Sequence, residues 1–110
     1  MTFGVNDHFN RNGQPITQDE YLRLHEDADY RVVRRTELVG DGGRKLHVIT
    51  SWMGRDQGPA LGGSGPPLIF GTIGHDVDTD DWLDRVEHFH ATEAEALEYH
   101  EELVERLTDR

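Results

Sequence analysis

The sequence contains no cysteine and no long apolar run. Without cysteine there are no disulfides, thiolate zinc sites or cysteine nucleophiles, which excludes the small secreted scaffolds held together by disulfides. No segment reaches the roughly 18 apolar residues of a membrane-spanning helix, so we expect no association with a membrane. The opening MTFGVNDHFNRNG has neither the basic start nor the apolar stretch of a secretory signal, which predicts a cytoplasmic protein.

Basic residues are also scarce, because 11 Lys and Arg stand against 22 Asp and Glu, for a net charge of −11. Phosphate backbones repel a chain with this balance, so we expect no direct binding to nucleic acid. One basic cluster stands out along the chain, formed by Arg31, Arg34 and Arg35 with Arg44 and Lys45. We interpret them as a solvated strand face that balances neighbouring acids.

The chain of 110 residues, 35% hydrophobic and 30% charged, has the size and composition of one small domain with a modest core. Residues 1–14 show no sustained periodicity and predict an irregular N-terminal arm. Residues 15–110 are expected to form the single domain.

Two helices are predicted from capping boxes. Thr17-Gln-Asp-Glu20 begins a short helix over about residues 18–27, with Ile16 and Tyr21 as its hydrophobic staple. Thr92-Glu-Ala-Glu95 begins a longer C-terminal helix. Its apolar stripe consists of Ala96, Leu97, His100, Leu103, Val104 and Leu107.

Strands are predicted between the helices. Alternation from Tyr30 to Val39 places Tyr30, Val32, Thr36 and Leu38 on one face. Residues 46–53 alternate again after a Gly-rich turn at 40–43, which predicts an antiparallel hairpin. A long loop over 54–67 leads to an apolar strand at 68–73 that is either covered on both faces or central in a sheet, and residues 75–81 are expected to be a loop.

Residues 84–90 could form a fourth strand or a helix, because Val86 and Phe89 fit neither period cleanly. The order of elements is therefore α-β-β-β-(β)-α. It predicts a small α+β domain in which the short N-terminal and longer C-terminal helices pack on an antiparallel sheet of three to four strands.

Seven histidines raise the question of a metal site. The sharpest grouping is His88-Phe-His90, whose side chains point the same way if they lie on a strand, with His75, Asp76 and Asp78 as further donors. No HExxH spacing accompanies them, and the acidic loop lacks the glycine and the distal glutamate of a calcium loop. We therefore expect no metal and no cofactor, and keep these five residues as the candidates should a metal bind.

Other catalytic patterns are missing as well. His100 falls in the apolar stripe, which predicts a buried histidine that donates to a backbone carbonyl. The glycines at 62–65 and 71–74 are not followed by the Lys-Ser/Thr of a phosphate loop, and neither Ser51 nor Ser64 has the surroundings of a nucleophile. We expect a protein that is not an enzyme.

Three motifs carry a resemblance: Trp52-Met-Gly54, Pro66-Pro-Leu-Ile-Phe70, and Thr92-Glu-Ala-Glu-Ala-Leu97 with His100. In this order and spacing the chain resembles small uncharacterised proteins encoded by tailed bacteriophages and prophages, several from actinobacterial hosts. The resemblance implies an accessory protein made in the host cytoplasm or packed in a virion, and brings no activity, substrate or cofactor. In those proteins a glutamate usually follows the Phe of the second motif, where this chain has Gly71.

These observations favour a small acidic accessory protein that binds a host or phage protein without catalysis, mimicking the charge of nucleic acid. The expected contact residues are the glutamates of the last helix, Glu95, Glu98, Glu101, Glu102 and Glu105. One alternative is a virion or assembly component, or a homo-oligomer, with contacts through Trp52, Trp82, Phe89 and Tyr99. The other is a metal-dependent enzyme built on His75, Asp76, Asp78, His88 and His90.

Overall fold

The computed structural model describes residues 8–56, 66–82 and 88–108. Its elements are α1 (Gln18–His25), α2 (Ala28–Arg31), β1 (Val32–Val39), the short 3-10 helix η1 (Asp41–Gly43), β2 (Lys45–Trp52), β3 (Phe70–Asp76), β4 (Asp81–Trp82), β5 (His88–His90) and α3 (Glu93–Leu107). The chain is a small α+β domain, as predicted. Across the described ranges, no helix combines the length and apolar character needed to cross a membrane.

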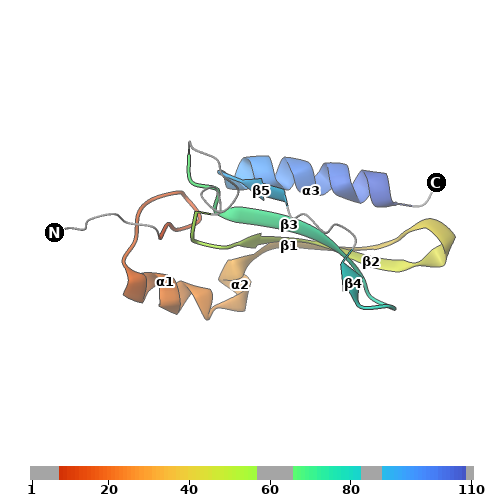
Figure 1. Cartoon of the computed structure of the whole chain (residues 1–110), viewed down its shortest axis with the longest axis horizontal. Coiled ribbons are helices and arrows are strands. Elements are labelled where there is room, and N and C mark those ends of the chain that lie inside the picture. The colour runs from red at the N-terminus through yellow and green to blue at the C-terminus, as the bar shows by residue number, and fades with distance from the viewer. Residues whose placement is uncertain (1–7, 57–65, 83–87, 109–110) are drawn as a thin grey trace.

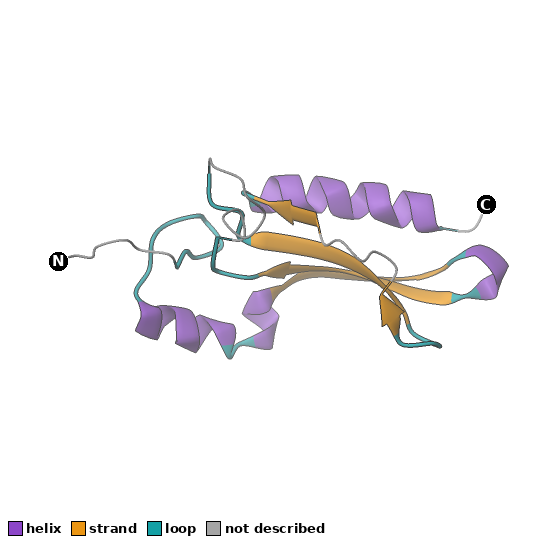
Figure 2. Cartoon of the chain, in the orientation of Figure 1, coloured by secondary structure: helices purple, strands orange, loops and turns teal. Residues whose placement is uncertain are grey.

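The sheet is antiparallel, and four of its strands follow one another in the order β1-β2-β3-β4. The fifth strand, β5, also pairs with β3, with Gly71 opposite Phe89. Strand β3 is therefore central, with β2 along one edge and the short strands β4 and β5 along the other. Helix α3 runs along the upper side of the sheet in Figure 1, and α1 and α2 lie below its left end. Figure 2 separates these layers by type of structure.

Strand β1 departs from the predicted alternation. Tyr30 belongs to α2, and the pairing register shifts between Val32 and Arg34, which marks a β-bulge. The bulge places Val33 against the core and leaves Val32 37% exposed, so the predicted face that joined Tyr30 and Val32 to Thr36 and Leu38 is wrong at its start. The hairpin itself and the buried alternate residues of β2 are confirmed.

Strand β3 is shifted toward the C-terminus relative to the prediction. It begins at Phe70 and continues to Asp76, because residues 74–76 pair with residues 46–48 of β2. The predicted loop at 75–81 is therefore reduced to a turn at 77–80 before β4. Of the predicted loop at 54–67, residues 57–65 lie outside the described part of the chain, as do residues 83–87 before β5.

Gly71 packs closely against the side chains of Met53 and Phe89. A Cβ atom built on Gly71 would lie 3.0 Å from Met53 Sδ and 3.3 Å from Cε1 of Phe89, the residue opposite it in β5. Any larger residue here would need Met53 and Phe89 to move by a few tenths of an ångström. The glycine at this position, where the phage-type motif has a glutamate, therefore suits the close packing of Phe89 against it.

The predicted N-terminal helix is divided into two. Thr17 Oγ1 accepts from the Glu20 amide at 3.1 Å, which confirms this half of the capping box. Helix α1 then ends at His25, because Asp27 adopts an extended conformation and caps α2 instead. The Asp27 carboxylate accepts from the amides of Asp29 and Tyr30 at 3.0 and 3.3 Å.

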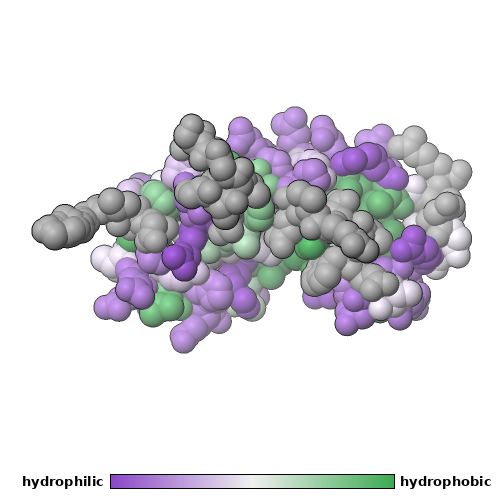
Figure 3. Space-filling model, viewed as in Figure 1, coloured by the Kyte–Doolittle hydropathy of each residue, from purple (hydrophilic) through white to green (hydrophobic). Residues whose placement is uncertain are grey.

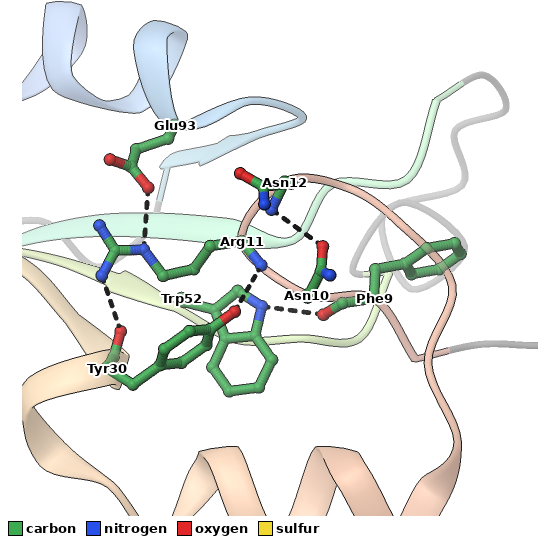
Figure 4. Close-up of polar contacts among 7 residues, drawn as sticks. All are labelled: Phe9, Asn10, Arg11, Asn12, Tyr30, Trp52 and Glu93. Carbon is green, nitrogen blue, oxygen red and sulfur yellow. Dashed lines mark hydrogen bonds and ion pairs between the residues drawn. The ribbon is translucent and has the colours of Figure 1, made fainter.

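Residues 8–14 of the predicted arm contact the rest of the domain (Figure 4). The Trp52 indole Nε1 donates to the Phe9 carbonyl at 2.9 Å, and the Arg11 amide donates to the Tyr30 hydroxyl at 2.9 Å. The Arg11 guanidinium donates to Glu93 at 2.8 Å and to the Tyr30 carbonyl at 3.2 Å. Arg11 thereby connects the arm to α2 and to the first turn of α3.

The hydrophobic core lies at the end of the sheet that the N-terminal arm contacts. Its buried cluster consists of Ile16, Trp52, Ile69, Phe70 and Ala96, with Phe9, Tyr21, Leu24, Tyr30 and Val33 packed against it. Trp52 is only 1% exposed, so this aromatic residue belongs to the core and does not form a contact surface.

Candidate functional site

Helix α3 has the capping residue and the buried stripe that its sequence predicted. The Thr92 hydroxyl accepts from the Glu95 amide at 3.1 Å at the N-terminus, and Ala96, His100 and Leu103 are buried against the sheet. The five predicted glutamates, Glu95, Glu98, Glu101, Glu102 and Glu105, are all exposed. In Figure 3 hydrophilic side chains cover much of the upper edge, where α3 runs in Figure 1.

A groove of about 370 Å³ lies between α3 and β5. Its α3 wall is formed by Glu95, Glu98, Tyr99 and Glu102, and its other wall includes Phe89 and His90. Positions 95, 98, 99 and 102 are separated by three, four and seven residues, a spacing that places them on one stripe of a helix. We call this feature the acidic groove.

The other two glutamates lie outside the acidic groove. Glu101 forms an ion pair with Arg34 of β1, which connects α3 to the sheet. Glu105 does not line the groove either. The structure therefore brings together three of the five predicted contact residues.

Tyr99 lies between the two histidines that were candidates for a metal site. Its ring is stacked with His88 at a centroid distance of 4.5 Å and contacts His90 at 5.3 Å. The Arg106 guanidinium lies 5.7 Å from the centre of the same ring. His88 and His90 do point toward the same side of β5, as their spacing predicted. Both of them contact the ring of Tyr99.

His90 is a polar group in the wall of the acidic groove without a complete set of partners. Its Nδ1 is buried and has no hydrogen-bond partner among the described residues. Burial lowers the pKa of His90, while the nearby Glu95 raises it and His88 lowers it further. The uncharged form of His90 is therefore favoured beside the glutamates.

The remaining metal candidates lie elsewhere, at the turn between β3 and β4. His75 Nε2 is 2.7 Å from Asp80, and Asp78 is exposed. Within the described ranges, no three side chains of types that bind metals come together. His75 and Asp76 thus lie at the end of β3 and Asp78 in the turn after it, whereas His88 and His90 lie on β5, where His90 lines the acidic groove.

Both carboxylate oxygens of Asp76 have partners. One accepts from Arg44 Nε and Nη2 at 2.9 and 2.6 Å, and the other accepts from the amides of Asp78 and Thr79 at 3.0 and 3.2 Å. The hydrogen bonds from Arg44, with those from the turn amides, hold the pKa of Asp76 below its ordinary value. This buried carboxylate therefore closes the turn and joins it to Arg44.

His100 is buried, as predicted, but its partners are hydroxyl groups and not a backbone carbonyl. Nε2 is 2.8 Å from Thr36 Oγ1 and Nδ1 is 2.7 Å from Thr50 Oγ1, which is itself 2.6 Å from Thr72 Oγ1. His100, Thr50 and Thr72 are all fully buried, so this network connects α3 to three strands and is closed to a substrate.

Protonation of His100 should weaken the fold. Burial lowers the pKa of His100, an effect that Glu101 opposes and Arg34 adds to. As the pH falls below the ordinary histidine value of about 6.5, the unfolded chain binds a proton that the folded protein does not, so the free energy of unfolding decreases. We expect urea denaturation to show lower stability at pH 5.5 than at pH 7.5.

The loss of stability between pH 7.5 and pH 5.5 should be smaller in His100→Asn. Part of the loss should remain in this variant, because the pKa of His90 is lowered too. His25→Asn, which removes an exposed histidine, is the matched control and should show the full loss. Equal stability at both pH values in the unmodified protein would contradict a neutral His100.

Searches of protein-family models, curated proteins and solved structures found no match to this chain. The resemblance to phage proteins therefore stays a prediction. What the sequence interpretation missed is the role of Tyr99, which stands on the same helical stripe as three glutamates and faces both histidines of β5. The spacing of residues 95, 98, 99 and 102 could have indicated that Tyr99 shares a stripe with the glutamates, but not that it faces the histidines.

Proposed function

We propose that the protein is a non-catalytic binding protein whose acidic groove accepts a basic segment of a partner protein. The observation that carries the proposal is the convergence of Glu95, Glu98 and Glu102 around Tyr99 in one groove of about 370 Å³. Carboxylates attract Lys and Arg side chains, and Phe89 and Tyr99 give the groove an aromatic lining against which an aliphatic stem can pack. This combination selects a basic segment with intervening apolar residues.

The partner in this proposal is a host or phage protein, in keeping with the resemblance to phage accessory proteins. The net charge of −11 accelerates association with a basic surface. A surface of that kind commonly contacts nucleic acid, so the protein acts by occupying it in place of the nucleic acid. Catalysis is not part of the proposal, because the His100 network is buried and the Asp76 carboxylate is held by Arg44.

A short labelled peptide of arginine, lysine and leucine tests the acidic groove directly. We expect the triple variant Glu95→Gln, Glu98→Gln and Glu102→Gln to weaken binding about tenfold at low salt, since each exposed charge pair contributes roughly 0.2–1 kcal/mol. Added salt should abolish most of the difference. Fluorescence anisotropy provides the measurement, with a peptide of aspartate, glutamate and leucine as the negative probe.

The matched control removes the same number of charges at exposed positions elsewhere, through Asp19→Asn in α1, Glu26→Gln at the C-cap of α1 and Asp29→Asn in α2. It should bind the basic peptide nearly as well as the unmodified protein. Equal weakening in the two triple variants would mean that net charge alone attracts the peptide, which overturns the proposed groove. A partner recovered from bacterial lysate should in addition be displaced by double-stranded DNA.

A further inference from the structure

A second pocket, of about 390 Å³, lies where α1, α2 and the end of β2 meet. Its polar lining consists of His25, Arg31, Ser51 and Arg55, and Tyr21 and Met53 are among its apolar residues. Among the residues that the structure describes, this lining includes no Asp or Glu, although acids outnumber bases two to one in the chain. Its electrostatic character is therefore opposite to that of the rest of the molecule.

Arg31, the last residue of α2, is the unusual member of this lining. Its Nε is buried and has no hydrogen-bond partner among the described residues. Four other arginines have carboxylate partners, since Arg11 pairs with Glu93, Arg23 with Glu20, Arg34 with Glu101, and Arg44 with Asp76. A buried donor on a charged group that lacks an acceptor is unfavourable, and native proteins rarely leave one in that state.

The basic cluster expected from the sequence is thus divided by the fold. Arg34 pairs with α3, Arg44 closes the turn at Asp76, and Arg35 contacts His47 at 3.0 Å. Only Arg31 of these four reaches the pocket, because α2 and the bulge in β1 separate it from the regular strand. The interpretation of these residues as one solvated strand face therefore fails at Arg31.

We propose that this pocket binds a small organic oxyanion, whose carboxylate or phosphate group supplies the missing acceptor for Arg31. The Nε edge of a guanidinium offers two parallel N–H groups that match the two oxygens of such a group. The hydroxyl of Ser51 is a further donor, and Tyr21 and Met53 receive the apolar body of the ligand. The volume lies within the range of small-molecule pockets.

This pocket shares no residue with the acidic groove, so the two proposals succeed or fail separately. Benzoate and phenyl phosphate are the probes for the two head groups, with benzamide as the uncharged analogue and benzylamine as the cationic one. Titrations followed by two-dimensional ¹H–¹⁵N NMR should shift the Arg31 Nε–H and Trp52 indole signals with the two anions. The more tightly bound anion identifies the preferred head group.

Arg31→Gln should weaken binding of both anions about tenfold or more, the loss expected for a hydrogen bond to a charged group. Arg35→Gln removes the same charge from an exposed arginine outside the pocket and should leave binding unchanged. Should Arg31→Gln fail to fold, Val32→Asp places a negative charge in the pocket lining at an exposed position and should also abolish binding. Val39→Asp, at an exposed position at the other end of β1, is its control.

Three results would overturn the proposal. They are shifts from benzamide as large as those from benzoate, undiminished binding in a folded Arg31→Gln variant, and the absence of any shift of the Arg31 signal with either anion. Each would mean that the pocket does not recognise an oxyanion through Arg31.

Discussion

His100→Ala is expected to lower the free energy of unfolding by about 3–5 kcal/mol. The substitution empties a fully buried volume and leaves Thr36 and Thr50 without their ring partner. A cavity of this kind costs several kcal/mol, and each buried hydroxyl left without its partner adds to that. Since small domains are stable by only about 5–15 kcal/mol, urea denaturation will show a large shift of the midpoint.

Two further variants define the origin of this loss. Thr50→Val removes the hydroxyl that joins His100 to Thr72 and should cost about 1–3 kcal/mol, less than the loss of the ring. His25→Ala, at an exposed position of α1, should change stability by no more than about 0.5 kcal/mol. If His100→Ala were as stable as His25→Ala, the network would have no structural importance.

Gly54→Ala is expected to destabilise the protein by about 2–5 kcal/mol. Gly54 has a φ of +77°, and a Cβ atom there would lie 2.6 Å from Tyr21 Cε1 and 2.7 Å from Trp52 Cζ2. The left-handed backbone costs a non-glycine residue about 1–2 kcal/mol, and overpacking adds about 1–3 kcal/mol. Thermal or urea denaturation measures the total.

Gly13→Ala separates the two contributions. Gly13 has a similar φ of +81°, but nothing lies within 4 Å of its added Cβ. It should therefore show the backbone cost alone. Gly54 also accepts a hydrogen bond from the Phe9 amide at 2.8 Å, so Gly54→Ala should speed hydrogen exchange at Phe9 as the arm loosens. Equal losses in the two alanine variants would contradict the packing of Tyr21 and Trp52 against Gly54.

Local sequence patterns were sufficient to predict where α1 and α3 begin and that β1 and β2 form a hairpin. Thr17 and Thr92 each accept from an amide three residues on, which depends only on neighbouring residues. The bulge in β1 could not be predicted this way, because it arises where β1 pairs with β2. The extension of β3 to Asp76 likewise depends on pairing with β2 and on Arg44, 32 residues away in the chain.

The candidate site was predictable only in part, for a similar reason. The glutamate face of α3 follows from helical spacing, but the choice among its five members depends on where β5 and β1 lie. Glu101 lies beside Arg34 of β1 and forms an ion pair with it, whereas Glu98 and Glu102 line the groove beside β5. The spacing of His88 and His90 correctly placed both on one side, yet no local pattern indicated that Tyr99 would face them.

Site-specific photo-crosslinking tests the proposed acidic groove most directly. A photoreactive phenylalanine derivative replaces Tyr99 in the groove or, as the control, Leu22 on the exposed face of α1. In bacterial lysate, position 99 should capture a partner that position 22 does not, and mass spectrometry should place the crosslink in a segment rich in Lys and Arg. Equal capture from both positions, or a crosslink to a segment without basic residues, would contradict the account.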